Sequence, residues 1–271
     1  DGHQVYVYNS STNGYPHRTW NQVRIITKHD PRKALGTLSQ FIYDFLCIRD
    51  CRYRDYDLIF QLGYTSSSLW GFLFPGRAVL VTHMDGLEWK RAKYNRLTRV
   101  FLRFAEKRAV VRSDVLIADA KAIGRYLSGR FGKQAVFIPY GADIPRNPAP
   151  DVLDTYGLRP FGYHLVIARF EPENNLEMII QGHLEAPSTM PLILIGNPDN
   201  AFGKRLRKRY RHPGILFTGA LYDTVPLDTL RHFSHLYFHG HSVGGTNPSL
   251  LEAMAAGCLI AAHAKEFNRE V

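Results

Sequence analysis

The sequence predicts an α/β fold in two domains, and three observations lead to this prediction. Short, almost wholly apolar runs recur at 56–62, 78–82, 163–168 and 192–195, and they have the length and composition of buried parallel strands. Segments with apolar residues at helical spacing follow several of them. A polar run with three prolines at 145–150 interrupts the series, so we place a domain boundary between residues 146 and 147.

The composition limits the class of protein. The chain has 271 residues, 45% of them hydrophobic, which is enough for one large core or two modest ones. The net charge of +10 predicts an anionic partner: nucleic acid, an acidic lipid surface or a phosphorylated substrate. No RNA-binding signature supports the first. Three cysteines do not make a disulfide framework, and no apolar run reaches the length of a membrane span.

The expected first domain, residues 1–146, alternates strands and helices. We expect strands at 5–8, 23–26, 56–62, 78–82, 115–118 and 135–139. Helices are expected at 35–51, 67–74, 89–112 and 121–131. The helix at 89–112 is strongly basic and amphipathic, which is typical of a surface that binds anionic lipid headgroups, or equally of a solvated helix in a basic protein.

The expected second domain, residues 147–271, repeats the pattern. Strands are expected at 163–168, 192–195, 215–217, 236–238 and 259–262, with helices at 176–183, 203–210 and 248–256. In open α/β sheets the carboxyl ends of the strands carry the ligand sites. Side chains that directly follow these strands are therefore the first candidates for function.

The stretch 239–257, HGHSVGGTNPSLLEAMAAG, has the pattern of an anion site. A strand ends in a flexible loop, Asn247 can cap a helix that begins at Pro248, and paired glycines let a phosphate approach the backbone. Glu252, one turn into the helix, can accept hydrogen bonds from a ribose. An ordinary strand-to-helix turn with a solvated glutamate remains the alternative. The candidate donor-binding residues here are Gly244, Gly245, Thr246, Asn247, Ser249, Leu250 and Glu252.

This stretch resembles the donor-binding motif of retaining glycosyltransferases of family 4, which have the GT-B fold. Two further motifs, HMDGLEWKR at 83–91 and ARFEPENN at 168–175, are similar to those of the rhamnosyltransferase-like group in that family. The resemblance implies two Rossmann-like domains facing a central cleft, an acceptor-side domain at 1–146 and a nucleotide-sugar domain at 147–271. It also implies that the chain is a fragment lacking the first strand-helix unit and the C-terminal end.

The resemblance implies a retaining transfer of a sugar, such as rhamnose, from a nucleotide diphosphate to a glycan or lipid-linked acceptor in polysaccharide biosynthesis. It implies a cytoplasmic enzyme, peripheral at the inner face of the membrane, with neither metal nor cofactor and no nucleic-acid partner. Two alternatives stay open: a sugar-nucleotide epimerase of the same fold, and a non-catalytic module that binds nucleotide sugars or membranes. Product formation without an acceptor would distinguish the epimerase.

The resemblance also assigns roles to residues outside the glycine loop. Arg169 corresponds to the arginine that binds the donor phosphates, although a surface ion pair with Glu171 or Glu173 is the alternative. Asn174, a further candidate donor-binding residue, stands where relatives commonly have lysine, and Gly244 where many have glutamate. His83 and Asp85 are expected to line the sugar and acceptor pocket, unless His83 is a buried structural residue.

Two smaller expectations complete the picture. Glu88 and Trp89 are candidates for the acceptor side, with the indole offering a face to a sugar ring, although Trp89 could equally belong to the core. His235, His239 and His241 could suggest a metal, but no aspartate or cysteine completes a recognisable ligand set. We therefore expect no metal.

Overall fold

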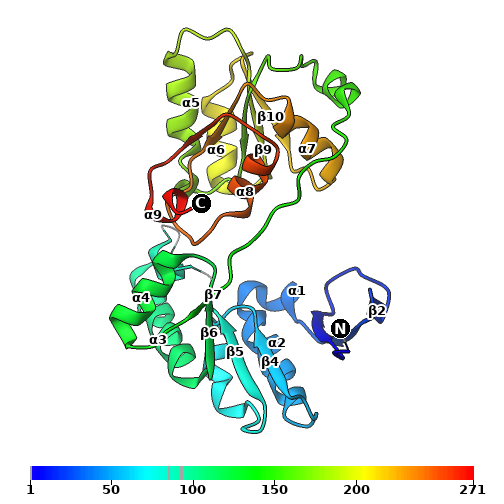
Figure 1. Ribbon diagram of the computed structural model, residues 1–271, viewed down its shortest axis with the longest axis vertical. Helices are drawn as coiled ribbons and strands as arrows, with labels where there is room; N and C mark the ends of the chain where they lie inside the picture. Colours follow the sequence, from blue (N-terminus) through cyan, green and yellow to red (C-terminus); the bar gives the residue numbers. More distant parts are fainter. Residues whose placement is uncertain (1, 85, 92–93) are drawn as a thin grey trace. The chain divides into compact units, whose positions relative to one another are not determined.

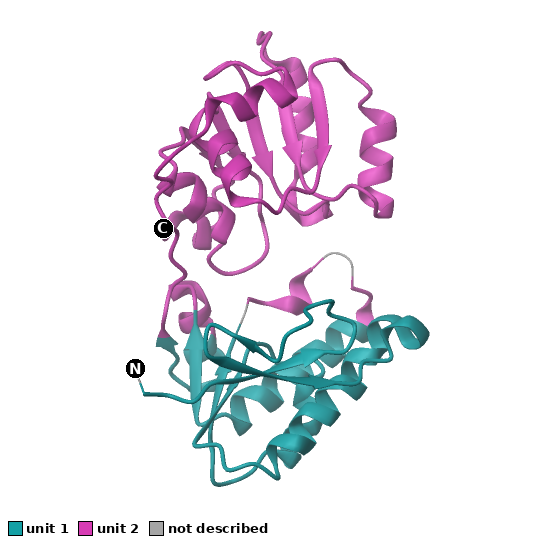
Figure 2. Ribbon diagram, turned by 90° about the vertical axis from the view of Figure 1, so that its right-hand side faces the viewer, with its two compact units in different colours: residues 1–84, 97–118, 127–136 teal, residues 85–96, 119–126, 137–271 magenta. Residues whose placement is uncertain are grey.

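The computed structural model describes residues 2–84, 86–91 and 94–271, and the chain divides into two compact units (Figures 1 and 2). Unit 1 comprises Asp1–Met84, Leu97–Ala118 and Leu127–Val136. Unit 2 comprises Asp85–Arg96, Asp119–Tyr126 and Phe137–Val271. The boundary predicted at 146/147 stays a prediction.

The main sheet of unit 1 has four strands in the order β4-β5-β6-β7: Leu58–Gln61, Val79–His83, Val115–Ala118 and Val136–Phe137. β4, β5 and β6 pair in parallel, with Val81 opposite Val115 and His83 opposite Ile117. The buried residues Leu80, Leu102 and Leu116 pack in this unit. Its helices are α1 Arg32–Leu35, α2 Ser39–Cys51, α3 Arg96–Arg112 and the second half of α4 Lys121–Phe131, with 3₁₀ turns η1 Gly36–Leu38 and η2 Ser67–Leu73.

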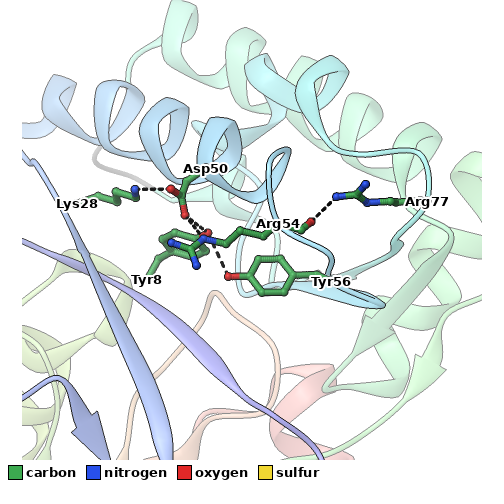
Figure 3. Close-up of polar contacts among 6 residues, drawn as sticks. All are labelled: Tyr8, Lys28, Asp50, Arg54, Tyr56 and Arg77. Atoms are coloured by element: carbon green, nitrogen blue, oxygen red, sulfur yellow. Dashed lines mark hydrogen bonds and ion pairs between the residues drawn. The ribbon is translucent and has the colours of Figure 1, made fainter.

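A smaller sheet has the strand order β1-β3-β2: Tyr6–Ser10, Val23–Lys28 and Thr19–Trp20. Polar contacts of Asp50 link this sheet to α2. The Asp50 carboxylate accepts hydrogen bonds from Lys28 Nζ and Tyr8 Oη, both at 2.7 Å, and from Arg54 Nε at 2.5 Å (Figure 3). Burial opposes ionisation, but these donors prevail and hold the pKa of Asp50 at about 2. Figure 3 also shows Arg77 donating to the Arg54 carbonyl, at 2.7 Å.

Unit 2 is built on a parallel sheet of five strands in the order β10-β9-β8-β11-β12 (Figure 1). The strands are Ile215–Gly219, Leu192–Ile195, His164–Ile167, Leu236–His239 and Ile260–Ala262. The intervening helices are α5 Leu176–Glu185, α6 Ala201–Arg209, α7 Thr224–His232 and α8 Pro248–Ala255. The remaining elements are η3 Glu88–Lys90, η4 Pro150–Tyr156, η5 Pro172–Asn174 and α9 Glu266–Arg269.

Alternating residues of these strands enter two different cores. Leu165, Ile193 and Tyr237 pack with Leu230 of α7 and Ala253 of α8. On the other face of the sheet, strand residues Val166 and Leu194 pack against α5 and α6. The helices contribute the buried residues Leu176, Ile180 and Leu206. Both faces are covered, which explains why these strands are apolar throughout rather than alternating.

The α9 helix is held by ion pairs and a hydrogen bond to the first half of α4. The Arg125 guanidinium pairs with Glu266 at 2.5 Å and also with Glu270, while Glu270 Oε2 accepts a 3.0 Å hydrogen bond from the Ala122 amide. Across the described residues, no helix combines the length and apolar character that crossing a membrane requires.

Candidate functional site

The carboxyl ends of the unit 2 strands bring the sequence-predicted residues to one edge of the sheet. Arg169 follows β8 by two residues, and the glycine loop follows β11, which is the neighbouring strand. On the other side of β8, the ends of β9 and β10 border a cavity of ≈ 410 Å³. Its lining residues include Asn197, Pro198, Thr218, Gly219 and Tyr222. A cavity, an arginine and a glycine loop therefore follow one another along this edge.

The glycine loop leads into α8 as the sequence predicts. Asn247 caps the helix through a 3.2 Å hydrogen bond from the Ser249 amide, and its side chain also accepts from Ser249 Oγ at 2.9 Å. Leu250 is buried, and its amide donates to the Asn247 carbonyl at 3.0 Å. The first helical amides are thus already capped by the chain, so the amides left for a ligand belong to the loop before Asn247.

Two segments from earlier in the chain lie against this loop. Gly86, at φ +63°, approaches Gly244 so closely that an added Cβ would stand 3.3 Å from Gly244 Cα. Thr246 Oγ1 donates to the Asp119 carbonyl at 2.7 Å, and an added Cβ on Gly245 would meet the Asp119 carboxylate. Gly86 and Gly245 therefore stand where the backbone comes too near its neighbours for a larger residue.

The turn that contains Arg169 is locked to the start of the loop. Ser242 donates to the Glu173 carbonyl through its amide, at 2.9 Å, and through Oγ, at 2.8 Å. Asn175 Nδ2 donates to the Gly240 carbonyl at 2.7 Å. Asn174 Nδ2 donates to the Arg169 carbonyl, also at 2.7 Å, so this asparagine braces the arginine's backbone.

Arg169 is exposed, and its charge reaches His241, whose pKa it helps to lower. The hydrogen bonds of Ser242 and Asn175 also tie the turn that carries Arg169 to the start of the glycine loop. The free head group and the loop together can hold an anion.

Several buried polar atoms gather at the same place without hydrogen-bond partners among the described residues. They are both carboxylate oxygens of Glu173, both ring nitrogens of His239, Nδ1 of His241 and Oδ1 of Asn268. An unpaired buried polar group costs free energy, and such groups are rare in folded proteins. Their concentration around the glycine loop indicates a functional region.

The two histidines form a stacked pair, with ring centroids 4.3 Å apart and planes 14° from parallel. Burial lowers the pKa of His239 to about 4. Burial, with the neighbouring His239 and Arg169, lowers the pKa of His241 to about 3. Both imidazoles are neutral at physiological pH, so they add hydrogen-bonding groups but no charge.

This pair predicts a loss of stability in acid. Because the unfolded histidine takes up a proton near pH 6.5 and folded His239 only near pH 4, its contribution is complete above 6.5 and is lost as the pH falls towards 4. Relative to a His239→Gln variant, the wild-type protein should lose about 2 kcal/mol of unfolding free energy between pH 7 and 4.5. Urea unfolding at a series of pH values measures this loss of unfolding free energy. The exposed His232→Gln variant should track the wild type, and parallel profiles for all three would contradict the prediction.

Glu252 is engaged in an ion pair that the sequence did not reveal. Its Oε2 pairs with the guanidinium of Arg231, which is buried on α7 and also binds Asp228 at 3.0 Å. The Glu252 side chain keeps 42% exposure. Arg231 therefore holds this carboxylate in place and leaves part of it accessible to a ligand.

The candidates from the first half of the chain lie as follows. His83 is the last residue of β5 and is buried in unit 1, while Asp85 lies outside the described residues. Glu88 pairs with Arg91 at 2.6 Å, and the Lys90 ammonium lies over the Trp89 ring at 5.5 Å. The roles proposed for these residues stay predictions.

Sequence reasoning missed the cavity at β9 and β10 and the unpaired Glu173. The signals were present: Gly196-Asn197-Pro198 directly follows a wholly buried strand, and Tyr222 follows another strand end at 88% exposure. The fully described residues contain no group of three His, Cys, Asp or Glu side chains arranged to hold a metal ion.

One family model matches part of the chain. It is described as a domain of unknown function (DUF1972) and covers residues 76–143. No curated protein matches the sequence.

Three solved structures resemble most of the chain. Anabaena HepE in complex with UDP is 19% identical with a TM-score of 0.68, over 92% of this chain and 69% of that one. Sucrose-phosphate synthase from Thermosynechococcus elongatus is 17% identical with a TM-score of 0.77, over 97% and 72%. A putative UDP-N-acetylglucosamine 2-epimerase from Listeria monocytogenes is 14% identical with a TM-score of 0.58, over 91% and 68%. The predicted α/β fold of the GT-B type is thereby confirmed.

Proposed function

We propose that this protein is a glycosyltransferase that uses a nucleoside diphosphate sugar as donor. The observation that carries the proposal is the alignment of cavity, Arg169 and glycine loop along one sheet edge. Ligands of open α/β sheets bind at this edge. HepE has been crystallised with UDP and with UDP-glucose, which supports the same ligand class here.

The site offers a place for each part of the donor. The ≈ 410 Å³ cavity suits a nucleoside, with Tyr222 and Asn197 at its wall. The diphosphate then lies between Arg169 and the loop amides of Gly245 and Thr246, and the ribose reaches the accessible part of Glu252. Arg231 keeps Glu252 oriented for this contact.

The donor sugar extends from the diphosphate, past Gly244, towards the buried cluster. Gly244 has no carboxylate for the sugar, and the carboxylate of Glu173, whose backbone carbonyl accepts from Ser242, is buried. A less polar donor such as a deoxysugar is consistent with this arrangement, and we propose rhamnose as the first candidate.

For the reaction we propose transfer with retention by front-side displacement. The departing phosphate oxygen takes the acceptor's proton, the bond to the anomeric carbon breaks, and the acceptor oxygen bonds to the same face. Charge develops on the leaving diphosphate, where Arg169 lies preorganised. The proposed acceptor is a glycan, free or lipid-linked.

The epimerase alternative has one specific observation in its favour, the similarity to the putative Listeria epimerase. Its decisive test is product formation from the donor without any acceptor. A transferase requires the acceptor for turnover, apart from slow hydrolysis of the donor.

The donor screen tests the proposal directly. We expect UDP-, GDP- or TDP-sugars, one class preferred, to raise the thermal unfolding midpoint, because a ligand that binds only the folded state stabilises it by about 2.7 kcal/mol at a hundred times its Kd. Differential scanning fluorimetry on the whole chain measures the shift. Adenosine at equal concentration is the control. If none of the nucleotide sugars shifts the unfolding midpoint, the proposed donor site is contradicted.

A membrane contact is proposed for the α3 helix. Leu97, Val100, Phe104 and Val111 recur at helical spacing and remain 83%, 66%, 49% and 69% exposed, among arginines and lysines of the same helix. An apolar stripe flanked by cations fits an anionic bilayer surface.

We expect a Leu97→Ser/Val100→Ser variant to lose binding to vesicles containing phosphatidylglycerol in co-sedimentation. Met178→Ser, at a similarly exposed apolar residue of α5, should retain it. Equal binding of wild type and double variant would contradict the contact.

A further inference from the structure

A second cavity, of ≈ 510 Å³, lies between α6 and strand β10. Its volume is that of a small-molecule site. β10 is the edge strand of the sheet, so this cavity borders backbone that pairs with a strand on one side only. It adjoins the nucleoside cavity, and Arg207 and Phe217 line both.

One wall of this cavity is a row of cations. Lys204, Arg207 and Lys208 stand one turn apart on the same face of α6, and Arg211 follows two residues after the helix ends. All four are exposed, and no aspartate or glutamate belongs to the lining. Within the described residues, none of the four makes an ion pair. By contrast, Arg209 on the same helix is neutralised by Glu177 at 2.6 Å.

Such a row favours a bound anion. Like charges three or four residues apart repel each other on a helix, although Arg207 and Lys208, in the last turn of α6, also lie at the negative end of its dipole. Bound anionic groups reverse the sign of the interaction, since Arg and Lys form charge-assisted hydrogen bonds with phosphate. The arrangement therefore favours a ligand with more than one negative charge.

The rest of the lining is mostly apolar and aromatic. It consists of Tyr210, His212, Ile215, Leu216 and Phe217. A concave wall of this kind encloses a ligand, whereas a bilayer contact needs apolar side chains that project outwards. The geometry thus suits a discrete phosphorylated molecule better than a membrane.

We propose that the cavity between α6 and β10 is a second ligand site, which binds a compound carrying two or more phosphate groups. This site differs from the donor site in its cations, which come from α6 and the following loop and do not include Arg169 or the glycine loop. Its Arg207 wall, shared with the nucleoside cavity, would let occupancy of one site influence the other.

Inorganic tripolyphosphate is the probe, measured by isothermal titration calorimetry on the whole chain. Because Arg169 could also bind it, the titrations use the Arg169→Ala protein as background. We expect one binding event that weakens at high salt, and Lys204→Glu or Lys208→Glu should each weaken it roughly tenfold or more. Arg205→Glu is the matched control on the same helix, since Arg205 lies over Phe202 and outside the cavity lining.

The outcomes separate this site from the donor site and from a membrane surface. Loss of tripolyphosphate binding in the two lysine variants, with binding retained in the Arg205 variant, supports the site even if no nucleotide sugar binds. Equal loss of tripolyphosphate affinity in all three variants would mean that only net charge matters, and it would overturn the proposed site. If the lysine variants lose only phosphatidylglycerol vesicle binding and keep tripolyphosphate, the surface contacts a membrane and the site is again overturned.

Discussion

An Arg169→Ala enzyme should transfer sugar about 10²-fold more slowly than the wild type, because it loses the cation that we propose meets the developing charge on the leaving diphosphate. The guanidinium is exposed and ends a turn whose backbone is fixed by Asn174 at 2.7 Å. Its backbone is therefore held in place while the side chain is exposed, and truncating that side chain leaves this hydrogen bond intact. The expected defect is in kcat and in donor binding rather than in folding.

The measurement is the release of nucleoside diphosphate from the preferred donor in the presence of acceptor, using the full-length enzyme. Arg205→Ala provides the control, since it removes the same group from an exposed helix face outside the sheet edge. Turnover of Arg169→Ala within a factor of two or so of the control would place Arg169 outside the chemistry. Unfolding midpoints of both variants should match the wild type.

Much of the fold follows from the sequence because its strands are buried on both faces. Residues 192–195 are apolar without a break and are wholly buried between two helical layers, so composition alone identified the strand. The same reasoning placed Arg169 and the glycine loop at strand ends. Asn247 and Pro248 then fixed the start of α8 by local cap chemistry.

Helix α7 shows where this reasoning failed. It contains Pro226, which resembles a helix breaker, yet the proline is the third residue of the helix and removes an amide that has no partner within the helix. The Asp223 side chain caps it by accepting from the Val225 amide at 3.1 Å. The expected helix at 89–112 also proved shorter, since α3 begins at Arg96 and a separate 3₁₀ turn covers Glu88–Lys90.

The missed parts of the site depend on strand order, which the sequence does not contain. β9 and β10 lie on one side of β8 and β11 on the other. This order sets the cavity lined by Asn197 and Tyr222 on one side of the Arg169 strand and the glycine loop on the other. The pairing of Glu252 with Arg231 is similarly non-local, because it joins two helices that both pack on one face of the sheet. Local periodicity carries no information about either contact.

The second large effect is expected at Gly240, the first loop residue after β11. A methyl group here would collide with the Asn174 carbonyl and lie 2.9 Å from Ile179 Cδ1, and neither a backbone carbonyl nor a packed isoleucine can move freely. We expect Gly240→Ala to lower the free energy of unfolding by about 3 kcal/mol. It should also weaken donor binding, because separating Asn174 from Gly240 shifts Arg169 relative to the loop.

Gly182→Ala is the matched control. Gly182 lies in α5 of the same unit with no neighbouring atom within 4 Å of an added Cβ, so alanine should stabilise that helix by roughly 0.5–1 kcal/mol. Urea unfolding of both variants, followed by nucleotide-sugar titration, gives the comparison. Opposite signs for the same chemical change would locate the effect in the contact between the Arg169 turn and the glycine loop. A Gly240→Ala protein as stable as the wild type would mean that the two segments do not pack closely, and Arg169 would then lack the fixed position that the proposed transfer requires.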